Sequence, residues 1–235
     1  SSLMETVVLT NQVAVTLGKI YRRGFKVDVS KLDEVRVEFE REKQDIEKRL
    51  TQQVRNLMGD TPINLNSPEQ MSWVIYSKKP LDKAMWANNF HPYMGTTEYK
   101  DNIKEYSNTV YKTEAVKCNT CRGEGYIRKV KKDGNLYSKP SRCIPCNTSG
   151  YLFNNTNLVA GLKFSAPNAK WISANGFTTN KAYLDILRNV AKKNNLTDAV
   201  NFLTDLQRLS ALDTYLSSFV EGISTHVKSD GKLHV

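Results

Sequence analysis

The sequence predicts a mainly α fold in which long antiparallel helices carry a small inserted α+β subdomain. Helical spacing of apolar residues dominates both ends of the 235-residue chain. Between about 79 and 165, aromatics, prolines and short polar stretches replace that spacing. The only four cysteines lie inside this middle stretch, in two Cys-x-x-Cys pairs. Together these observations divide the chain into helices at 1–78, an inserted subdomain at 79–165, and helices at 166–235.

Two helices are predicted before residue 60. The first covers residues 4–23, where apolar side chains repeat at helical spacing, and Gly24 ends it because glycine readily takes a positive φ. A short extended step at 25–27 follows, and Asp28 or Ser30 then caps a long helix over 30–58. Its apolar stripe is narrow, which is typical of a helix packed along one partner.

Residues 63–76 predict a short capped helix. Ser67 is the expected N-cap, Pro68 takes the first helical position, and Gln70 can close the capping box. The amino end of this helix exposes N–H groups beside Asn64, Asn66 and Ser67, and such an end can hold a phosphate.

The middle stretch begins with an aromatic cluster and contains the cysteines. We interpret the cluster as a small core rather than a base-stacking platform; it consists of Trp86, Phe90, His91, Pro92 and Tyr93.

The two cysteine pairs, Cys118-Asn-Thr-Cys121 and Cys143-Ile-Pro-Cys146, predict one metal site. A two-residue gap lets both thiolates of a pair reach one ion, and two pairs complete the four-sulfur shell that structural Zn²⁺ prefers. Glycines after each pair allow tight turns whose amides point at sulfur. We therefore expect one structural Zn²⁺ in a zinc ribbon of about residues 112–152.

A β-hairpin is expected between the pairs, with strands at 126–130 and 136–139 and a turn at 132–135.

The alternatives to a metal site for the four cysteines are two disulfides or a redox site. No cysteine lies outside the pairs and no leader segment is visible, which favours a reducing compartment. A redox pair normally occurs singly in a βαβ setting, which is missing here. The segment Cys118-Asn-Thr-Cys-Arg-Gly-Glu-Gly125 resembles one unit of the DnaJ-type cysteine-rich region, which implies a zinc fold and not a chaperone.

Helical spacing returns after the middle stretch. Thr178 or Thr179 is the expected cap of a helix through about Lys193. Thr197 caps a second long helix that Gly222 ends. A turn at Asp230-Gly231 leads into a last strand, for which the sequence shows no partner.

The charge balance favours a polyanionic partner. The chain carries 34 Lys and Arg against 24 Asp and Glu, a formal charge of +10. Positive charge is concentrated at 112–142, which predicts phosphate contact by Arg128, Lys129, Lys131 and Lys132 among others.

No run approaches the length of about 18 apolar residues that a membrane helix needs, so we expect a cytoplasmic protein without a membrane partner.

Five segments in sequence order resemble the thumb of family A DNA polymerases. They are Gly24-Phe-Lys-Val-Asp28, Asn64-Leu-Asn-Ser-Pro-Glu-Gln70, Gly176-Phe-Thr-Thr-Asn180, Arg208-Leu-Ser-Ala-Leu-Asp-Thr-Tyr215 and Asp230-Gly-Lys-Leu-His234. The fourth is one residue shorter than the family pattern. The cysteine-bearing stretch has no counterpart in the common bacterial enzymes, and a phage polymerase is where such a thumb insertion is expected.

The resemblance implies a grip on primer–template or duplex DNA through its backbone, with the palm and fingers as further partners. The residues it implies as DNA contacts are Asn64, Asn66, Ser67, Gln70, Thr178, Asn180, Arg208 and Ser210. The alternatives are local capping without a ligand and, for Arg208, a surface salt bridge. The family's catalytic carboxylates lie in the palm, beyond the matched segments. We therefore expect no polymerisation by this chain alone, and no exonuclease site.

Two other functions stay open from the sequence. The chain could be an interaction module in which the zinc insertion docks a processivity or replisome protein and the helices serve as scaffold. It could instead be a free-standing redox enzyme that uses the cysteine pairs. Stoichiometric zinc without reactive thiols would exclude the second of these.

Overall fold

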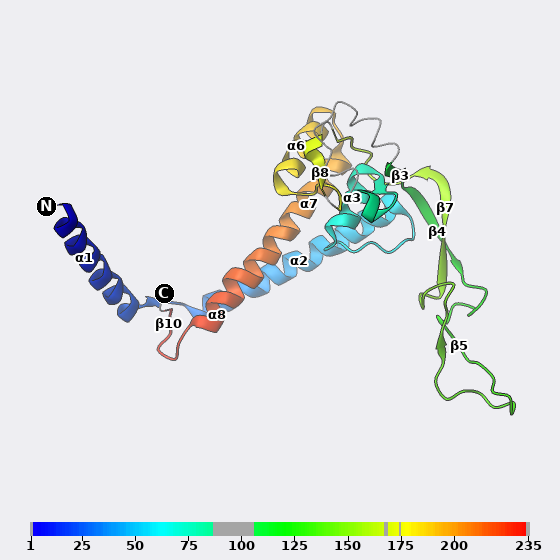
Figure 1. The fold of residues 1–235 in the computed structure, drawn as a ribbon, viewed down its shortest axis with the longest axis horizontal. Coiled ribbons are helices and arrows are strands. Elements are labelled where there is room, and N and C mark those ends of the chain that lie inside the picture. Colours follow the sequence, from blue (N-terminus) through cyan, green and yellow to red (C-terminus); the bar gives the residue numbers. More distant parts are fainter. Residues whose placement is uncertain (1, 87–105, 167–168, 174, 234–235) are drawn as a thin grey trace. The chain divides into compact units, whose positions relative to one another are not determined.

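The computed structural model describes residues 2–86, 106–166, 169–173 and 175–233 (Figure 1). Helices make up about half of the chain, and the described strands form five small two-stranded antiparallel sheets. The chain divides into two compact units, one of residues 1–48 with 205–235 and one of residues 49–204. The predicted division at 78 and 165 stays a prediction. Within the described part of the chain, no helix is both long enough and apolar enough for a bilayer crossing.

The first unit begins with α1 (Ser2–Arg23), which ends at Gly24 with a φ of 62°. Strand β1 (Phe25–Lys26) follows, and Asp28 caps the next helix by accepting a hydrogen bond from the N–H of Lys31 at 3.0 Å. β1 pairs antiparallel with β10 (Lys232–Leu233), with Phe25 opposite Leu233. The sequence interpretation of an unpaired last strand was therefore wrong, because a two-residue strand gives too little pattern to identify its partner.

Two long helices pair antiparallel within this unit. They are the first part of α2 (Val29–Met58) and the later part of α7 (Thr197–Thr214). Phe39 packs against Tyr215 with ring centroids 5.8 Å apart, and Glu42 is ion-paired with Arg208, so positions fall along α7 as they rise along α2. Lys43 adds an ion pair with Asp213 at 2.6 Å. Among the described residues of this unit, the buried apolar side chains on these two helices and their continuation are Ile46, Leu206, Leu209, Leu212 and Val220.

The last long helix runs further than the sequence predicted. α7 continues as the π-helix η4 (Tyr215–Glu221) and then as α8 (Gly222–His226). Gly222 has a φ of −59° and lies inside the helix, so the prediction that it ends the helix was wrong. A glycine that ends a helix usually takes a positive φ, which Gly222 does not. The helix instead ends at His226, with Val227 as its C-cap at a φ of −70°.

The second unit starts where α2 ends. Gly59 has a φ of 83° and bridges to Thr113, and a Cβ there would lie 2.1 Å from the Thr113 carbonyl oxygen. Helix α3 (Pro68–Tyr76) follows with Ser67 as its N-cap, as predicted. Gln70 donates its N–H to Ser67 Oγ at 3.3 Å, but its side chain accepts from the N–H of Asn64 and not from that of Ser67.

Short sheets and aromatic packing complete the core of this unit. β2 (Lys78–Pro80) pairs with β3 (Ser107–Thr109), and β8 (Ile172–Ser173) pairs with β9 (Gly176–Phe177). The single-turn helices α4 (Lys83–Met85) and η3 (Ala169–Trp171) lie beside them in sequence. Trp86 is fully buried and donates its indole N–H to the Ser173 carbonyl at 2.7 Å, which confirms its predicted core role. The other members of the predicted aromatic cluster lie outside the described residues.

Helix α6 (Lys181–Lys193) begins one or two residues later than predicted. Its N-cap is Asn180, whose Oδ1 accepts from the N–H of Ala182 at 3.2 Å. Thr178 instead accepts from the N–H of Asn180, so the prediction of Thr178 or Thr179 as the cap was wrong. Either residue type can cap a helix, and only the backbone path decides between neighbours.

Residues 111–159 form a segment that we call the cysteine arm. Its root is a long ladder between β4 (Tyr111–Lys117) and β7 (Tyr151–Val159), which the sequence analysis missed. Further along, β5 (Tyr126–Ile127) pairs with β6 (Ser141–Arg142), and Val130 bridges Leu136. The predicted hairpin and its turn are thus present, with Gly134 in the turn at a φ of 84°. The second strand lies at 141–142 and not at the predicted 136–139, where only Leu136 forms a bridge.

Candidate metal centre

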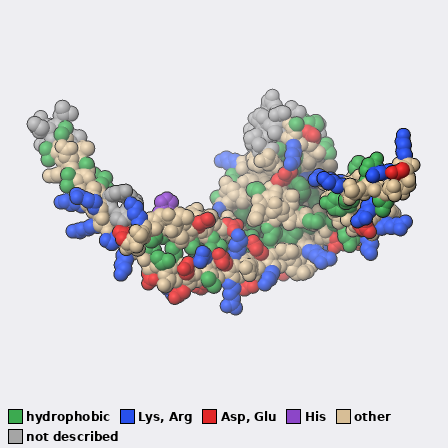
Figure 2. All heavy atoms as spheres, turned by 90° about the horizontal axis from the view of Figure 1, so that it is seen from below, with side chains coloured by type: hydrophobic (Ala, Val, Ile, Leu, Met, Phe, Trp, Pro, Cys, Tyr) green, Lys and Arg blue, Asp and Glu red, His purple; other side chains and the backbone are tan. Residues whose placement is uncertain are grey.

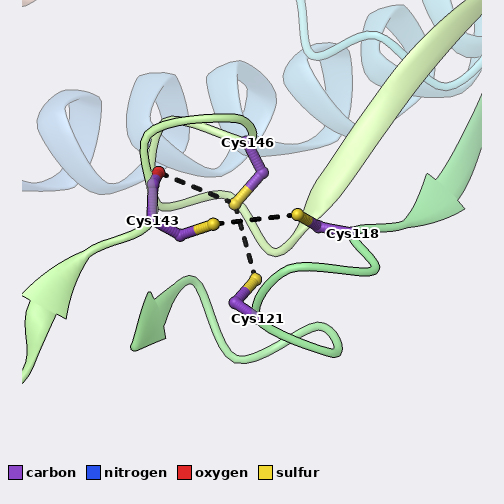
Figure 3. Close-up of side chains that lie close together, drawn as sticks. All are labelled: Cys118, Cys121, Cys143 and Cys146. Carbon is purple, nitrogen blue, oxygen red and sulfur yellow. Dashed lines mark hydrogen bonds between the residues drawn. The ribbon is translucent and has the colours of Figure 1, made fainter. Parts of the chain in front are cut away.

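The four cysteine sulfurs converge on one point in the cysteine arm (Figure 3). Cys118 Sγ lies 3.7 Å from Cys143 Sγ, and Cys121 Sγ lies 3.6 Å from Cys146 Sγ. All four sulfurs lie within 4.8 Å of one another, and all four residues are buried. Each Cys-x-x-Cys pair therefore contributes both of its thiols to one site.

These distances match a four-sulfur shell around one metal ion. A tetrahedral site with metal–sulfur bonds of about 2.3 Å has neighbouring sulfurs about 3.8 Å apart. A disulfide would require sulfurs about 2.05 Å apart, and all four cysteines are free thiols here. The residues therefore fit a single bound ion, and a structural zinc site is compatible with that geometry.

Two turns of matching backbone conformation build the site, one at residues 118–125 and one 25 residues later at 143–150. The N–H of Cys118 donates to the Gly150 carbonyl at 2.9 Å, and the N–H of Cys143 donates to the Gly125 carbonyl at 3.0 Å. The first cysteine of each turn thus donates a backbone hydrogen bond to the last glycine of the other turn. The second half of the site repeats the first, although their sequences share little beyond the cysteines and the last glycine.

Glycine is required at the last position of each turn. Gly125 and Gly150 have φ of 76° and 77°, and a Cβ on Gly125 would lie 2.2 Å from the Thr148 carbonyl oxygen. A Cβ on Gly150 would similarly lie 2.3 Å from the Gly123 carbonyl oxygen. The two turns differ two residues before their last glycine. The first turn has Gly123 at this position, whereas the second has Thr148 at a φ of 68°. Thr148 therefore holds a left-handed conformation that a β-branched residue rarely adopts.

Backbone amides point at sulfur, as the sequence analysis expected. The N–H of Gly125 donates to Cys121 Sγ at 3.2 Å. The N–H groups of Cys121 and Thr120 lower the pKa of the Cys118 thiol to about 6, whereas burial raises the pKa of the Cys143 thiol to about 12. The backbone amides therefore favour the thiolate form of Cys118, and a bound cation would have to displace the protons that the thiols still hold.

The predicted contacts of the segment 64–70 all take part in local structure. Asn64 Oδ1 accepts from the N–H of Asn66 at 2.9 Å, and Ser67 and Gln70 make the cap bonds described above. Asn64 and Asn66 are exposed, while Ser67 and Gln70 are half-buried. Capping alone accounts for these bonds, and DNA contact by the four residues stays a prediction.

Thr178 and Asn180 belong to the same unit as the segment 64–70. The Thr178 carbonyl accepts from Tyr76 Oη at 2.8 Å, and the Thr178 side chain is half-buried. Asn180 caps α6 and is exposed. Tyr76 thus fixes the position of this predicted contact segment against the end of α3.

Arg208 forms a two-pronged ion pair with Glu42. Arg208 Nε and one terminal nitrogen donate to the two Glu42 carboxylate oxygens at 2.7 and 2.6 Å, and Glu42 raises the pKa of Arg208. The guanidinium also lies 5.9 Å from the centroid of the Phe39 ring. The salt bridge considered for Arg208 from the sequence is therefore present, while DNA contact by Arg208 and by the exposed Ser210 stays a prediction.

The basic residues of the hairpin are free to meet a ligand. Arg128, Lys129, Lys131 and Lys132 are all exposed. Lys131 Nζ lies 5.7 Å from the centroid of the Tyr137 ring, and none of the four forms an ion pair with a residue in the described part of the chain.

Sequence reasoning missed the residue that anchors the cysteine arm. Asp60 accepts from the N–H of Ala115 at 3.0 Å and from Arg55 at 3.2 Å, which holds the pKa of the Asp60 carboxyl below its ordinary value. The N–H of Asp60 also donates to the Thr113 carbonyl. Asp60 follows Gly59 at the end of a helix, where a turn carboxylate is common, so its distant partners in β4 left no sequence signal.

Comparisons of the chain with protein-family models, with curated proteins and with solved structures found no match.

Proposed function

We propose that this chain is a non-catalytic grip for duplex DNA, the thumb region of a family A, phage-like DNA polymerase with a metal-held insertion. The observation that carries the proposal is the charge on the cysteine arm. Residues 112–142 contain nine Lys and Arg against three Asp and Glu, and eight of the nine basic residues are exposed. Figure 2 shows Lys and Arg side chains standing out from this arm, at the right of the view.

Charge of this kind suits a grip that must slide along DNA. Phosphate contacts are independent of base sequence, so the duplex can advance by a base pair without loss of the interaction. A hairpin presents lysine and arginine along both strands, and a bound ion keeps so small an element folded. The sequence resemblance adds the helix starts at Ser67 and Asn180 as further backbone contacts.

We infer that the ion is Zn²⁺. Four buried cysteines with no open position are the ligand set of structural zinc sites. Thiols that bind metal require a reducing environment, which agrees with the expected cytoplasmic location.

A salt titration tests the proposed grip. Fluorescence anisotropy of a labelled duplex with a primer–template junction should show binding that weakens steeply with salt. The logarithm of affinity should fall with a slope of about 0.9 per phosphate contacted. Absence of binding even at low salt would contradict the proposal.

A matched pair of variants locates the contact. Lys131→Ala/Lys132→Ala on the hairpin should reduce the salt slope by about 1 for each lysine that meets a phosphate. Lys192→Ala/Lys193→Ala removes the same charge from another exposed pair of adjacent lysines, at the end of α6. Equal effects of the two double variants would mean that only net charge matters, and would count against a grip by the hairpin.

A second function, docking of a partner protein, is favoured by exposed apolar side chains on the same arm. Ile144 lies in the turn between Cys143 and Cys146 and is 88% exposed, and Val130 and Leu158 are each 62% exposed. Replacement of residues 112–152 by a short Gly/Ser linker discriminates between the two functions. Unchanged duplex affinity together with loss of a replisome partner would favour docking, whereas loss of duplex affinity would favour the grip.

A further inference from the structure

A pocket of about 650 Å³ lies in the second unit, between the end of α2, helix α3 and the β2–β3 sheet. Its volume is in the range of pockets that hold small molecules. The residues that line it come from segments far apart in the sequence, since strands β4 and β7 of the cysteine arm also contribute to it. None of the lining residues is among the cysteines or the residues expected to contact duplex DNA.

The lining combines three kinds of chemistry. Trp73, Tyr111 and Phe153 are aromatic, and Lys78 and Lys79 are cationic. Asn108 and Asn155 add amide groups that can both donate and accept hydrogen bonds. No Asp or Glu belongs to the lining that the described residues form. The pocket therefore favours a ligand that is both planar and anionic.

Trp73 is the most informative residue of the lining. Its indole nitrogen is buried and has no hydrogen-bond partner in the described part of the chain. Buried donors of this kind are rare, and each calls for a specific explanation. Lys79 Nζ lies 6.0 Å from the centroid of the Trp73 ring, which places a cation beside the aromatic surface.

We propose that this pocket binds a nucleotide unit, with the base against the aromatic side chains and the phosphate near Lys79. An uncharged aromatic ligand would make no use of the positive charge on the lysines, and a simple anion would make no use of the aromatic rings. Stacking of bases on aromatic side chains beside cations is how proteins hold unpaired nucleic acid. The ligand is either an unpaired stretch of a strand or a free nucleotide, since both offer the same chemistry. The inference does not depend on the grip on duplex DNA.

Tryptophan fluorescence tests the proposal directly. The chain has three tryptophans, and Trp86 and Trp171 are buried in the core. Titration with an unlabelled oligothymidylate and, separately, with thymidine triphosphate should quench the fluorescence of the full chain if a base stacks on Trp73. Quenching by the oligonucleotide alone would identify an unpaired strand as the ligand, and quenching by both would identify the single nucleotide.

Two variants keep the test specific. Trp73→Phe should abolish the quench while weaker binding persists in an anisotropy assay with labelled oligothymidylate. Lys79→Ala, a change at an exposed position, should weaken that binding by about fivefold or more, and Lys79→Arg should restore it. Lys192→Ala removes one charge from an exposed site outside the pocket and should have a smaller effect than Lys79→Ala.

The outcomes separate this inference from the proposed function. Absence of a quench in the unmodified chain with both ligands would overturn the inference, and so would unchanged oligothymidylate binding in Lys79→Ala. If duplex binding fails while the quench persists, the grip is wrong and the pocket stands. If Lys131→Ala/Lys132→Ala weakens duplex binding but leaves the quench intact, the two sites are independent.

Discussion

The cysteine arm and the paired helices of the first unit are held by different forces. The buried core of the metal site consists of the four cysteines. Among the described residues, the partly buried apolar side chains packed against them are Ile127 and Leu152. The helices bury a row of apolar side chains from Ile46 to Val220 and add ion pairs along their length. One region depends on a bound ion and the other on apolar burial.

This difference explains where the two regions tolerate change. A helix pair spreads its stability over many contacts, so the loss of one costs little. The arm concentrates its stability in four sulfurs and two turns, because a small hairpin cannot bury enough apolar surface to fold alone. Substitutions in the arm should therefore have larger and more local effects than substitutions along the helices.

Removal of the metal should have the largest effect on folding, and this effect should be limited to the cysteine arm. A chelator, or Cys118→Ser, is expected to unfold residues 110–152 while the long helices persist, since ligand binding is the source of the arm's folding energy. Backbone NMR should show loss of dispersed signals from the arm, with helical circular dichroism nearly unchanged. Asn119→Ser, in the same turn but outside the sulfur shell, serves as control. Helical signal that falls in step with metal loss would contradict the separation of the two regions.

A substitution that separates the two cysteine turns should have the second-largest effect. Gly125→Ala places a methyl group against the Thr148 carbonyl, so the two turns can no longer cap each other. We expect a loss of about 3 kcal/mol in metal binding, or roughly a hundredfold in affinity, in competition with a chromophoric chelator. Gly134→Ala is the control, because Gly134 has a similar positive φ of 84° but a Cβ there would meet nothing within 4 Å. An equal loss in both variants would show that backbone strain alone, and not contact between turns, limits the arm.

The arm also shows how far sequence reasoning reached. Two Cys-x-x-Cys pairs predict a four-sulfur site because spacing and ligand chemistry leave few other arrangements, and the sulfurs do converge. The β4–β7 ladder that supports the site went unpredicted. Its strands contain Lys, Glu and Asn at positions open to solvent on both faces, so the alternation that marks a half-buried strand is absent.

For the helices, sequence reasoning predicted the elements themselves but not how they end or what they pack against. Their existence followed from apolar spacing, but their ends and partners did not. Thr178, Thr179 and Asn180 are all good caps, and only tertiary contacts, such as the bond from Tyr76 to the Thr178 carbonyl, select Asn180. Glu42 is a charged residue within the apolar stripe of α2, and no sequence pattern indicates that Arg208, 166 positions away, pairs with it.

The Glu42–Arg208 pair should contribute modestly to the helices. Both side chains are more than a third exposed, at 38% and 40%, so solvent screens their attraction. A double-mutant cycle with Glu42→Ala and Arg208→Ala, followed by denaturant unfolding, should give a coupling of about 0.5–1 kcal/mol that declines as salt is raised. The solvent-exposed pair Lys31–Glu34 offers a control cycle with a smaller value. A coupling of zero would remove the ion pair from the forces that hold the helices together.

The smallest predicted effect lies where the two turns differ, at Thr148. The first turn has glycine at the equivalent position, and Thr148 takes a φ of 68° that is unfavourable for a β-branched residue. Thr148→Gly relieves that strain but makes the unfolded chain more flexible, so the two effects partly cancel. We expect a net gain of about 0.5 kcal/mol in the metal-bound arm, seen as slightly tighter metal binding in the chelator competition. Weaker binding would mean that the hydrogen bond from the Thr148 hydroxyl to the Asn147 carbonyl, at 2.6 Å, holds the second turn in shape more than the strain opposes it.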